Sequence, residues 1–176
     1  MNFWHDLQFG DKEKFTTIIE IPKLSRVKYE LDKKTGFIKV DRILDSSIHY
    51  PTNYGFIPQT LCGDDDPLDV LLLSYEPLIP GCIIQAKPVG LLNMTDDDKN
   101  DEKILAAPTK DPRFNNINDI SDVEPHILKE IQHFFKIYKN SQKKEVAVKE
   151  WENKEKAIEA IEKSTNLYKE KYKSQS

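Results

Sequence analysis

Residues 63–73 read Gly63-Asp64-Asp65-Asp66-Pro67-Leu68-Asp69-Val70-Leu71-Leu72-Leu73, and they join a dense acidic segment directly to a continuous apolar one. A short, uninterrupted apolar run of this kind predicts a strand that is buried on both faces. Carboxylates packed this closely repel one another unless a cation or solvent screens them. The stretch therefore predicts a buried strand with a concentration of negative charge at its mouth.

Segments on both sides of this run also have strand patterns, either β-branched or alternating between apolar and charged residues. They are residues 15–21, which stop at Pro22, then 27–31, 37–42, 82–92 and 104–107. Thr35-Gly36 is a turn signal, so residues 27–42 predict a hairpin. Because side chains two apart in a strand share a face, Lys28 and Glu30 are expected to lie side by side.

The hydrophobic period changes after Asp119, where helical spacing begins. Apolar residues at spacings of three and four form one stripe: Ile127, Leu128, Ile131, Phe134, Phe135 and Tyr138. This helix could start with a capping box of Ser121 and Glu124, or with Pro125 in its first turn. A second helix is expected from near Asn153 to about Lys169, with Ala157, Ile158, Ile161 and Leu167 facing inward. Several strands followed by two helices predict an α+β fold with a closed or strongly curved sheet.

Bulk composition sets further limits. A chain of 176 residues predicts a single domain over 1–176. The net charge of −4 disfavours a nucleic-acid partner, and no apolar run approaches the roughly 20 residues that cross a bilayer. The first six residues lack the basic start and apolar stretch of a secretory signal. Cys62 and Cys82 are interpreted as small buried hydrophobes, and we expect a cytoplasmic protein without a membrane partner.

Asp64, Asp66 and Asp69 form the first candidate metal site. In an extended chain Asp64 and Asp66 point the same way and can converge on one cation. Oxygen ligands without nearby His or Cys favour a hard cation, Mg²⁺ first and Mn²⁺ next. A solvated acidic loop built from turn-forming residues would show the same three aspartates. An EF-hand loop fits poorly, because Pro67 interrupts the segment and the closing Glu is missing.

A second acidic segment contains Asp96 and Asp101, followed by Lys103. Two carboxylate-rich loops together could hold more than one metal, and such sites clamp the attacking and leaving oxygens of phosphoryl transfer. Candidate phosphate donors lie near expected strand or helix ends: Lys28, Arg42, Tyr54, Lys103, Tyr138 and Lys139. Any one of them could instead be an ordinary solvated or core side chain, but several donors together suit phosphate groups.

Other chemistries find little support. Ser46, Ser47 and His49 lack a nucleophile motif such as Gly-x-Ser-x-Gly. The four histidines show no HExxH spacing for zinc, and neither a Walker motif nor a Gly-x-Gly-x-x-Gly loop is present.

The segment Asp64-Asp65-Asp66-Pro67-Leu68-Asp69-Val70 resembles the signature of the family I soluble inorganic pyrophosphatases. Further segments resemble the family in the right order: Ile19-Glu20-Ile21-Pro22, Lys28-Tyr29-Glu30, Val40-Asp41-Arg42, Tyr50-Pro51-x-Asn53-Tyr54-Gly55, Pro88-Val89-Gly90, Met94-Thr95-Asp96, Asp101-x-Lys103, His133-Phe134-Phe135-x-x-Tyr138-Lys139 and Trp151-Glu152-Asn153. The resemblance covers roughly residues 15–161, and a set of this size is very specific. The short chain is similar to the prokaryotic type.

The resemblance implies an α+β fold, a compact five-stranded OB-like β-barrel with two C-terminal helices packed outside. It implies hydrolysis of inorganic pyrophosphate to two phosphates by a metal-activated water at a site with several Mg²⁺ ions, and assembly as a homohexamer. The implied metal ligands are Asp64, Asp66, Asp69, Asp96 and Asp101, with Glu20 and Glu30 acting through water or nearby. Asp66 is the implied proton acceptor. The phosphates would be held by Lys28, Arg42, Tyr54, Lys103, Tyr138 and Lys139.

Two positions depart from the family pattern. Asp65 stands where the family often has Gly, and Glu145 stands about where many relatives have Trp. Two rival functions also remain open: a metal-dependent phosphatase for organic phosphates or nucleotides, and a non-catalytic OB-type binding domain. The second would need a basic groove with stacking aromatics, whereas this chain has aspartates in the corresponding region.

Overall fold

The structure is a computed structural model that describes the backbone of residues 1–96, 99–139 and 146–172. Its strands are β1 (Phe15–Ile21), β2 (Val27–Leu31), β3 (Ile38–Ile43), β4 (Asn53–Phe56), β5 (Asp69–Leu72), β6 (Ile83–Asp96), β7 (Lys99–Pro108) and β8 (Val146–Glu152). The helices are α1 (Pro125–Ile137) and α2 (Lys154–Tyr172), with two short 3-10 turns, η1 (Pro112–Phe114) and η2 (Ile120–Asp122).

Five strands close into a ring. β1 pairs with β4, β4 with β5, β5 with β7, β7 with β6, and β6 returns to β1. β8 extends the sheet beyond the ring by pairing with β6. Closure removes the unpaired sheet edges that an open sheet would expose. The expected five-stranded barrel is therefore confirmed.

The apolar run that follows the acidic segment forms β5, a strand covered on both faces. Val70, Leu71 and Leu72 are each at most 1% exposed. β5 lies between β4, to which it is antiparallel, and β7, to which it is parallel. The parallel register sets Asp69 beside Lys103, so the acidic mouth of β5 meets a lysine on the neighbouring strand.

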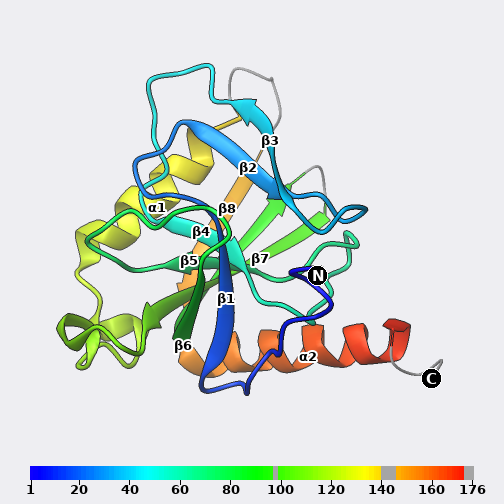
Figure 1. Ribbon diagram of the computed structural model, residues 1–176. Helices are drawn as coiled ribbons and strands as arrows, with labels where there is room; N and C mark the ends of the chain where they lie inside the picture. The colour runs from blue at the N-terminus through cyan, green and yellow to red at the C-terminus, as the bar shows by residue number, and fades with distance from the viewer. Residues whose placement is uncertain (97–98, 140–145, 173–176) are drawn as a thin grey trace.

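The remaining elements surround this barrel (Figure 1). β2 and β3 form the expected hairpin, which is a separate two-stranded sheet beside β1. α2 packs along β6 and β7, and α1 packs against β8. In the view of Figure 1 the hairpin and α2 lie on opposite sides of the barrel. Both helices thus lie outside the barrel, as expected.

The two alternatives for the start of α1 are resolved in favour of Pro125. Glu124 caps this helix, its side chain accepting hydrogen bonds from the backbone N–H groups of His126 and Ile127. The inward stripe is only partly correct. Ile131, Phe134, Phe135 and Tyr138 are buried, but Ile127 is 37% exposed because it lines an open cavity near Tyr50 and Phe114 instead of the packed core.

The inward face of α2 also differs from the expectation. Ala157 and Ile161 are buried as predicted, whereas Ile158 and Leu167 are only half-buried. Small and polar residues complete the buried face, namely Ala160, Ser164, Thr165 and Tyr168. Cys62 and Cys82 are free and half-buried against the core.

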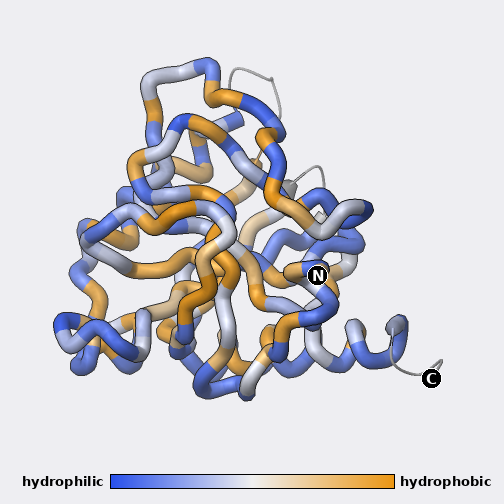
Figure 2. Tube along the Cα trace, viewed as in Figure 1, coloured by the Kyte–Doolittle hydropathy of each residue, from blue (hydrophilic) through white to orange (hydrophobic). Residues whose placement is uncertain are grey.

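Two strands, β4 and β8, are absent from the sequence-based prediction. β4 has only four residues and contains Gly55, and β8 carries charged residues on its open side. Both form because neighbouring strands supply hydrogen-bond partners, which a local pattern does not reveal. Figure 2 shows hydrophobic segments along the barrel strands and hydrophilic ones at the periphery, including the outer end of α2.

Gly55 makes the closest backbone approach in the barrel, which generates a test. A Cβ added there would lie 1.9 Å from the carbonyl oxygen of Ile18 on β1. We expect Gly55→Ala to lower the free energy of unfolding by about 3 kcal/mol or more, because backbone must move. Urea unfolding followed by circular dichroism measures this. Gly63→Ala is the matched control, since nothing lies within 4 Å of a Cβ there. Equal stability of the two variants would contradict the prediction.

Candidate functional site

A polar cleft of about 450 Å³ opens between the barrel and the β2–β3 hairpin. It is lined by side chains from six elements and the loops between them: Glu20, Lys28, Tyr29, Glu30, Leu31, Lys33, Arg42, Tyr54, Asp64, Asp66, Pro67, Asp69, Asp101, Lys103, Tyr138 and Lys139. Every predicted site residue is in this set except Asp96. The backbone of Asp96 ends β6, and its side chain lies outside the described residues. The cleft therefore gathers residues that are more than 100 positions apart, such as Glu20 and Lys139.

Lys103 is the buried centre of the cleft. Its ammonium group donates to Asp69 Oδ2 and Asp101 Oδ1, both at 2.8 Å, and to the hydroxyl of Tyr54 at 3.1 Å. Tyr54 also donates to Asp69. Burial alone would lower the pKa of Lys103, but the charges of Asp101 and Asp69 hold that pKa well above its usual value. Lys103 is therefore a permanent cation that joins β4, β5 and β7.

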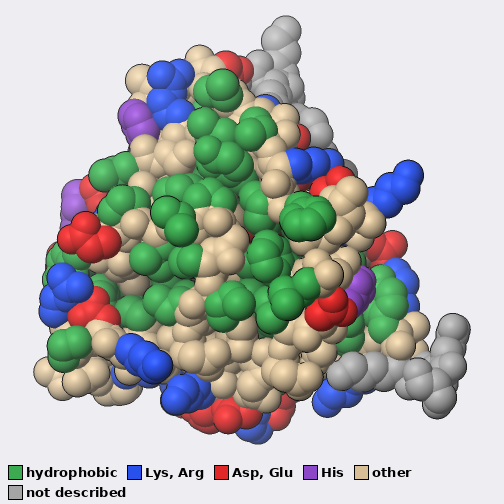
Figure 3. Space-filling view, in the orientation of Figure 1, with side chains coloured by type: hydrophobic (Ala, Val, Ile, Leu, Met, Phe, Trp, Pro, Cys, Tyr) green, Lys and Arg blue, Asp and Glu red, His purple; other side chains and the backbone are tan. Residues whose placement is uncertain are grey.

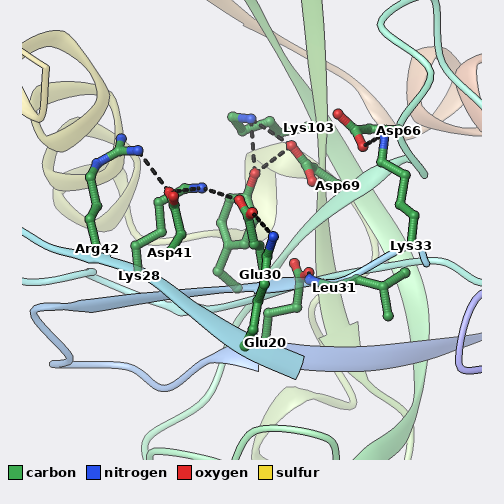
Figure 4. A network of polar contacts seen from close by, with 12 residues as sticks. Glu20, Lys28, Glu30, Leu31, Lys33, Asp41, Arg42, Asp66, Asp69 and Lys103 are labelled. Atoms are coloured by element: carbon green, nitrogen blue, oxygen red, sulfur yellow. Dashed lines mark hydrogen bonds and ion pairs between the residues drawn. The ribbon is translucent and has the colours of Figure 1, made fainter. Parts of the chain in front are cut away.

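Two further cationic side chains lie on the β2–β3 hairpin. Lys28 and Arg42 are direct partners across β2 and β3. Asp41 accepts from both, at 2.8 Å from Lys28 Nζ and 2.8 Å from Arg42 Nη1 (Figure 4). Lys28 also donates to Glu30 at 3.1 Å, which confirms that these two side chains share a face. Burial lowers the pKa of Lys28, but Asp41 and Glu30 more than offset this and raise it.

Arg42 carries the clearest unmet hydrogen-bonding group. Its Nε is buried and has no hydrogen-bond partner among the residues that the structure describes. A buried donor without an acceptor is costly, and the guanidinium plane matches the geometry of phosphate oxygens. The guanidinium of Arg42 lines the cleft and therefore suits an anionic ligand there. Tyr138 and Lys139, at the end of α1, line the same space.

Glu20 lies at the floor of the cleft and is only 7% exposed. Its Oε1 accepts from the backbone N–H of Leu31 at 2.6 Å. Burial raises the pKa of the Glu20 carboxyl to about 8, and the neighbouring charge of Asp69 adds to the rise. A carboxyl in this state holds its proton near neutral pH.

The acidic loop before β5 forms the open rim. The backbone N–H of Asp66 donates to Asp64 Oδ1 at 3.1 Å, and Asp65 has a left-handed backbone with φ 68°. Partial burial, together with the charges of Asp66 and Asp101, raises the pKa of Asp64. Lys33 lies 2.5 Å from Asp66, and Lys171 at the end of α2 lies 2.7 Å from Asp65. The loop is thus held by lysines from two distant segments.

The acidic residues of the cleft are of the type that binds a hard divalent cation. Asp64, Asp66, Asp69 and Asp101 offer only carboxylate oxygens in one cleft. They are not yet gathered into one ligand group. Among the described side chains, no three His, Cys, Asp or Glu are placed to hold a metal ion. Lysines stand between them instead, so metal binding would exchange ammonium contacts for metal contacts.

Two functional side chains escaped the sequence analysis. Lys33 lines the cleft, but its sequence neighbour Lys34 has the same chemistry, so only the tertiary contact distinguishes them. Asp41 was visible within the segment Val40-Asp41-Arg42, yet its role as the common acceptor for Lys28 and Arg42 depends on strand pairing. Glu145, one of the two departures from the family pattern, lies outside the described residues.

Comparisons with known proteins find similar sequences and similar structures. The family model described as inorganic pyrophosphatase matches residues 17–169. Soluble inorganic pyrophosphatase 1 of Arabidopsis thaliana is 51% identical over 169 residues, covering 95% of this chain and 80% of that protein. The crystal structure of inorganic pyrophosphatase from Thermus thermophilus superposes with a TM-score of 0.91 at 41% identity, covering 96% of this chain and 99% of that chain.

A more distant structure is similar over almost the same length. It is an N-terminally truncated vacuolar soluble pyrophosphatase of Trypanosoma cruzi in complex with PPi. The TM-score is 0.90 at 26% identity, covering 98% of this chain and 80% of that chain.

The raised pKa of Glu20 predicts a pH-dependent stability. In the unfolded chain this carboxyl loses its proton near its ordinary pKa of 4.5, whereas the folded protein holds the proton to about 8. Stability of the metal-free protein should therefore fall as pH rises from 4.5 to 8. Glu20→Gln removes this loss and keeps an acceptor for the backbone N–H of Leu31. Above pH 8 the free energy of unfolding of the variant should therefore exceed that of the wild type by roughly 1–4 kcal/mol.

Urea unfolding in EDTA at several pH values measures the effect. Glu155→Gln, on an exposed position in the first turn of α2, is the control and should keep the wild-type pH dependence. A Glu20→Gln profile parallel to that of the wild type would show that Glu20 ionises normally.

Proposed function

Since the chain belongs to the inorganic pyrophosphatase family, we propose that the polar cleft around Lys103 is the place where it hydrolyses pyrophosphate. The enzyme is a metal-dependent diphosphatase that converts pyrophosphate to phosphate. The observation that carries the proposal is the meeting, in one cleft, of carboxylates that suit a metal and cationic donors that suit phosphate. The PPi complex of the Trypanosoma cruzi relative supports a substrate of this kind.

We assign the metal to Mg²⁺, with Mn²⁺ as a possible substitute, because every candidate ligand is a carboxylate. The proposed ligands are Asp64, Asp66, Asp69, Asp96 and Asp101, with Glu20 and Glu30 nearby. A bound divalent cation neutralises negative charge and makes water a stronger acid. We propose that each site binds several such ions.

The cations and hydroxyls of the cleft are assigned to the substrate. Pyrophosphate carries several negative charges, and Arg42, Tyr138 and Lys139 are proposed to stabilise the leaving phosphate. Lys28, Tyr54 and Lys103 orient the other phosphate. Donors that are already in place when charge develops lower the barrier without reorganisation.

Asp66 is proposed to accept the proton of the attacking water. It lies on the rim between Asp64 and the start of β5, facing the cleft, and its side chain is half-exposed. A carboxylate is a weak base, but cations in the site lower the pKa of the water and shrink the mismatch. Asp69, tied to Lys103 and Tyr54, is assigned chiefly to metal binding.

An apolar face supports assembly into the proposed homohexamer. Large hydrophobic side chains that are more than half exposed include Leu24, Phe37, Val40, Ile43, Tyr75, Ile79 and Ile83. Figure 3 shows hydrophobic side chains gathered over the face in front of β1. Exposed apolar area of this extent is typical of protein contacts. No helix within the described residues is long and apolar enough to span a membrane, and a cytoplasmic location stays a prediction.

A phosphate-release assay tests the proposed substrate and metal. We expect turnover of pyrophosphate with Mg²⁺, less with Mn²⁺, and none in excess EDTA. ATP and p-nitrophenyl phosphate serve as controls for an organic-phosphate phosphatase, and their hydrolysis should be far slower. Full activity in EDTA, or faster release from the organic phosphates, would overturn the assignment.

Two asparagine substitutions separate the roles of Asp66 and Asp69. Asp66→Asn should lower turnover at neutral pH by about 100-fold or more, because proton acceptance is lost, and higher pH should partly restore it. Asp69→Asn should mainly weaken Mg²⁺ binding, so added Mg²⁺ should partly rescue it. Turnover measured against both Mg²⁺ and pH distinguishes the two patterns. Normal turnover of Asp66→Asn in excess Mg²⁺ would make Asp66 a ligand only.

Sedimentation velocity tests the assembly. The expected species is six times the 20.5 kDa chain, and it should persist at micromolar concentration. Replacing the exposed Ile79 and Ile83 with serine should weaken assembly if they lie in the contact, because less apolar area would be buried. A monomer of 20.5 kDa at that concentration would exclude the hexamer.

A further inference from the structure

Lys33 reaches the cleft from the turn between β2 and β3. Its ammonium group lies 2.5 Å from Asp66 Oδ1 and donates to the backbone carbonyl of Asp65 at 2.9 Å. Figure 4 shows this contact on the opposite side of Asp69 and Lys103 from the Lys28–Arg42 pair. Lys33 therefore occupies one oxygen of the carboxylate that the proposed function needs as metal ligand and proton acceptor.

Lys33 and Lys103 both hold carboxylates that are proposed as metal ligands, but they differ in how firmly they are fixed. The side chain of Lys103 is 3% exposed and contacts Asp69, Asp101 and Tyr54. The side chain of Lys33 is 44% exposed, and that of Asp66 is 51% exposed. An ion pair open to water is weak and easily separated, whereas a buried one is not. Lys33 is thus the exchangeable counter-ion and Lys103 the permanent one.

A lysine in this position opposes both roles of Asp66. A divalent cation and an ammonium group repel each other when they share one carboxylate. The ammonium group also occupies an oxygen that would otherwise be open to a proton from water. Withdrawal of Lys33 makes Oδ1 available for either role.

Lys33 keeps other contacts when it withdraws. The carbonyl oxygen of Asp65 already accepts from it, and its Nζ lies 6.0 Å from the centroid of the Trp4 ring. An aromatic face at this distance still attracts a cation. The flexible side chain of lysine can therefore leave Asp66 without losing every partner.

We propose that Lys33 is a positioning residue that neutralises Asp66 in the metal-free enzyme and yields it when a divalent cation binds. It therefore competes with the metal and sets the metal concentration at which the site fills. This inference rests on the proposed metal role of Asp66.

Calorimetric titration of the substrate-free, full-length protein with Mg²⁺ tests the competition. Lys33→Gln should lower the dissociation constant about two- to five-fold, the range that an exposed ion pair allows. Lys33→Arg keeps the charge and should stay near the wild type. Lys34→Gln is the matched control, because it removes the same charge from an exposed neighbouring position. In an Asp66→Asn background, Lys33→Gln should have no further effect.

The direction of the change decides between explanations. If Lys33 only braced the loop, Lys33→Gln would weaken Mg²⁺ binding, and this result would overturn the proposal. Equal affinities of Lys33→Gln and Lys34→Gln would overturn it as well. If wild-type protein binds no Mg²⁺, or Asp66→Asn leaves binding and pyrophosphate turnover unchanged, the proposed function fails instead. The two failures are therefore separable.

Discussion

The buried ammonium group of Lys103 links three strands of the barrel and holds the cleft together. It lies where the parallel strands β5 and β7 run side by side, and it donates hydrogen bonds to Asp69, Asp101 and Tyr54. A buried charge is tolerated only when it is paired and hydrogen-bonded. The site and the barrel are thus coupled, because a shift in the β5–β7 register would leave the charge of Lys103 buried without its partners.

The carboxylates of the cleft form ion pairs with lysine and arginine side chains of the same chain. Lys103 pairs with the inner carboxylates, and Lys33 pairs with Asp66. Lys28 and Arg42 both pair with Asp41. These contacts pair the carboxylates of the site with cations of the same chain. They also explain why the described acidic side chains line one cleft without forming a ready ligand group.

Asp65 has a backbone conformation that is unusual for a residue other than glycine. Its φ of 68° lies in the left-handed region, where glycine is favoured and aspartate is tolerated at some cost. Lys171 at the end of α2 contacts its carboxylate, and Lys33 holds its carbonyl. The C-terminal helix and the hairpin thereby stabilise the loop that carries Asp64 and Asp66.

The sequence by itself determined the β-rich class, the buried strand after the acidic loop, the β2–β3 hairpin and both helices. It also pointed to most of the charged cleft residues, partly through the chemistry of carboxylates, lysines and arginine and partly through resemblance to a family. Tertiary structure decided β4 and β8, whose hydrogen bonds come from distant strands, and the exposure of Ile127, which depends on a neighbouring cavity. It alone distinguished Lys33 from Lys34 and made Asp41 the shared partner of Lys28 and Arg42. The physical reason is that a local pattern records which groups a segment can offer, while the closed barrel decides which of them meet.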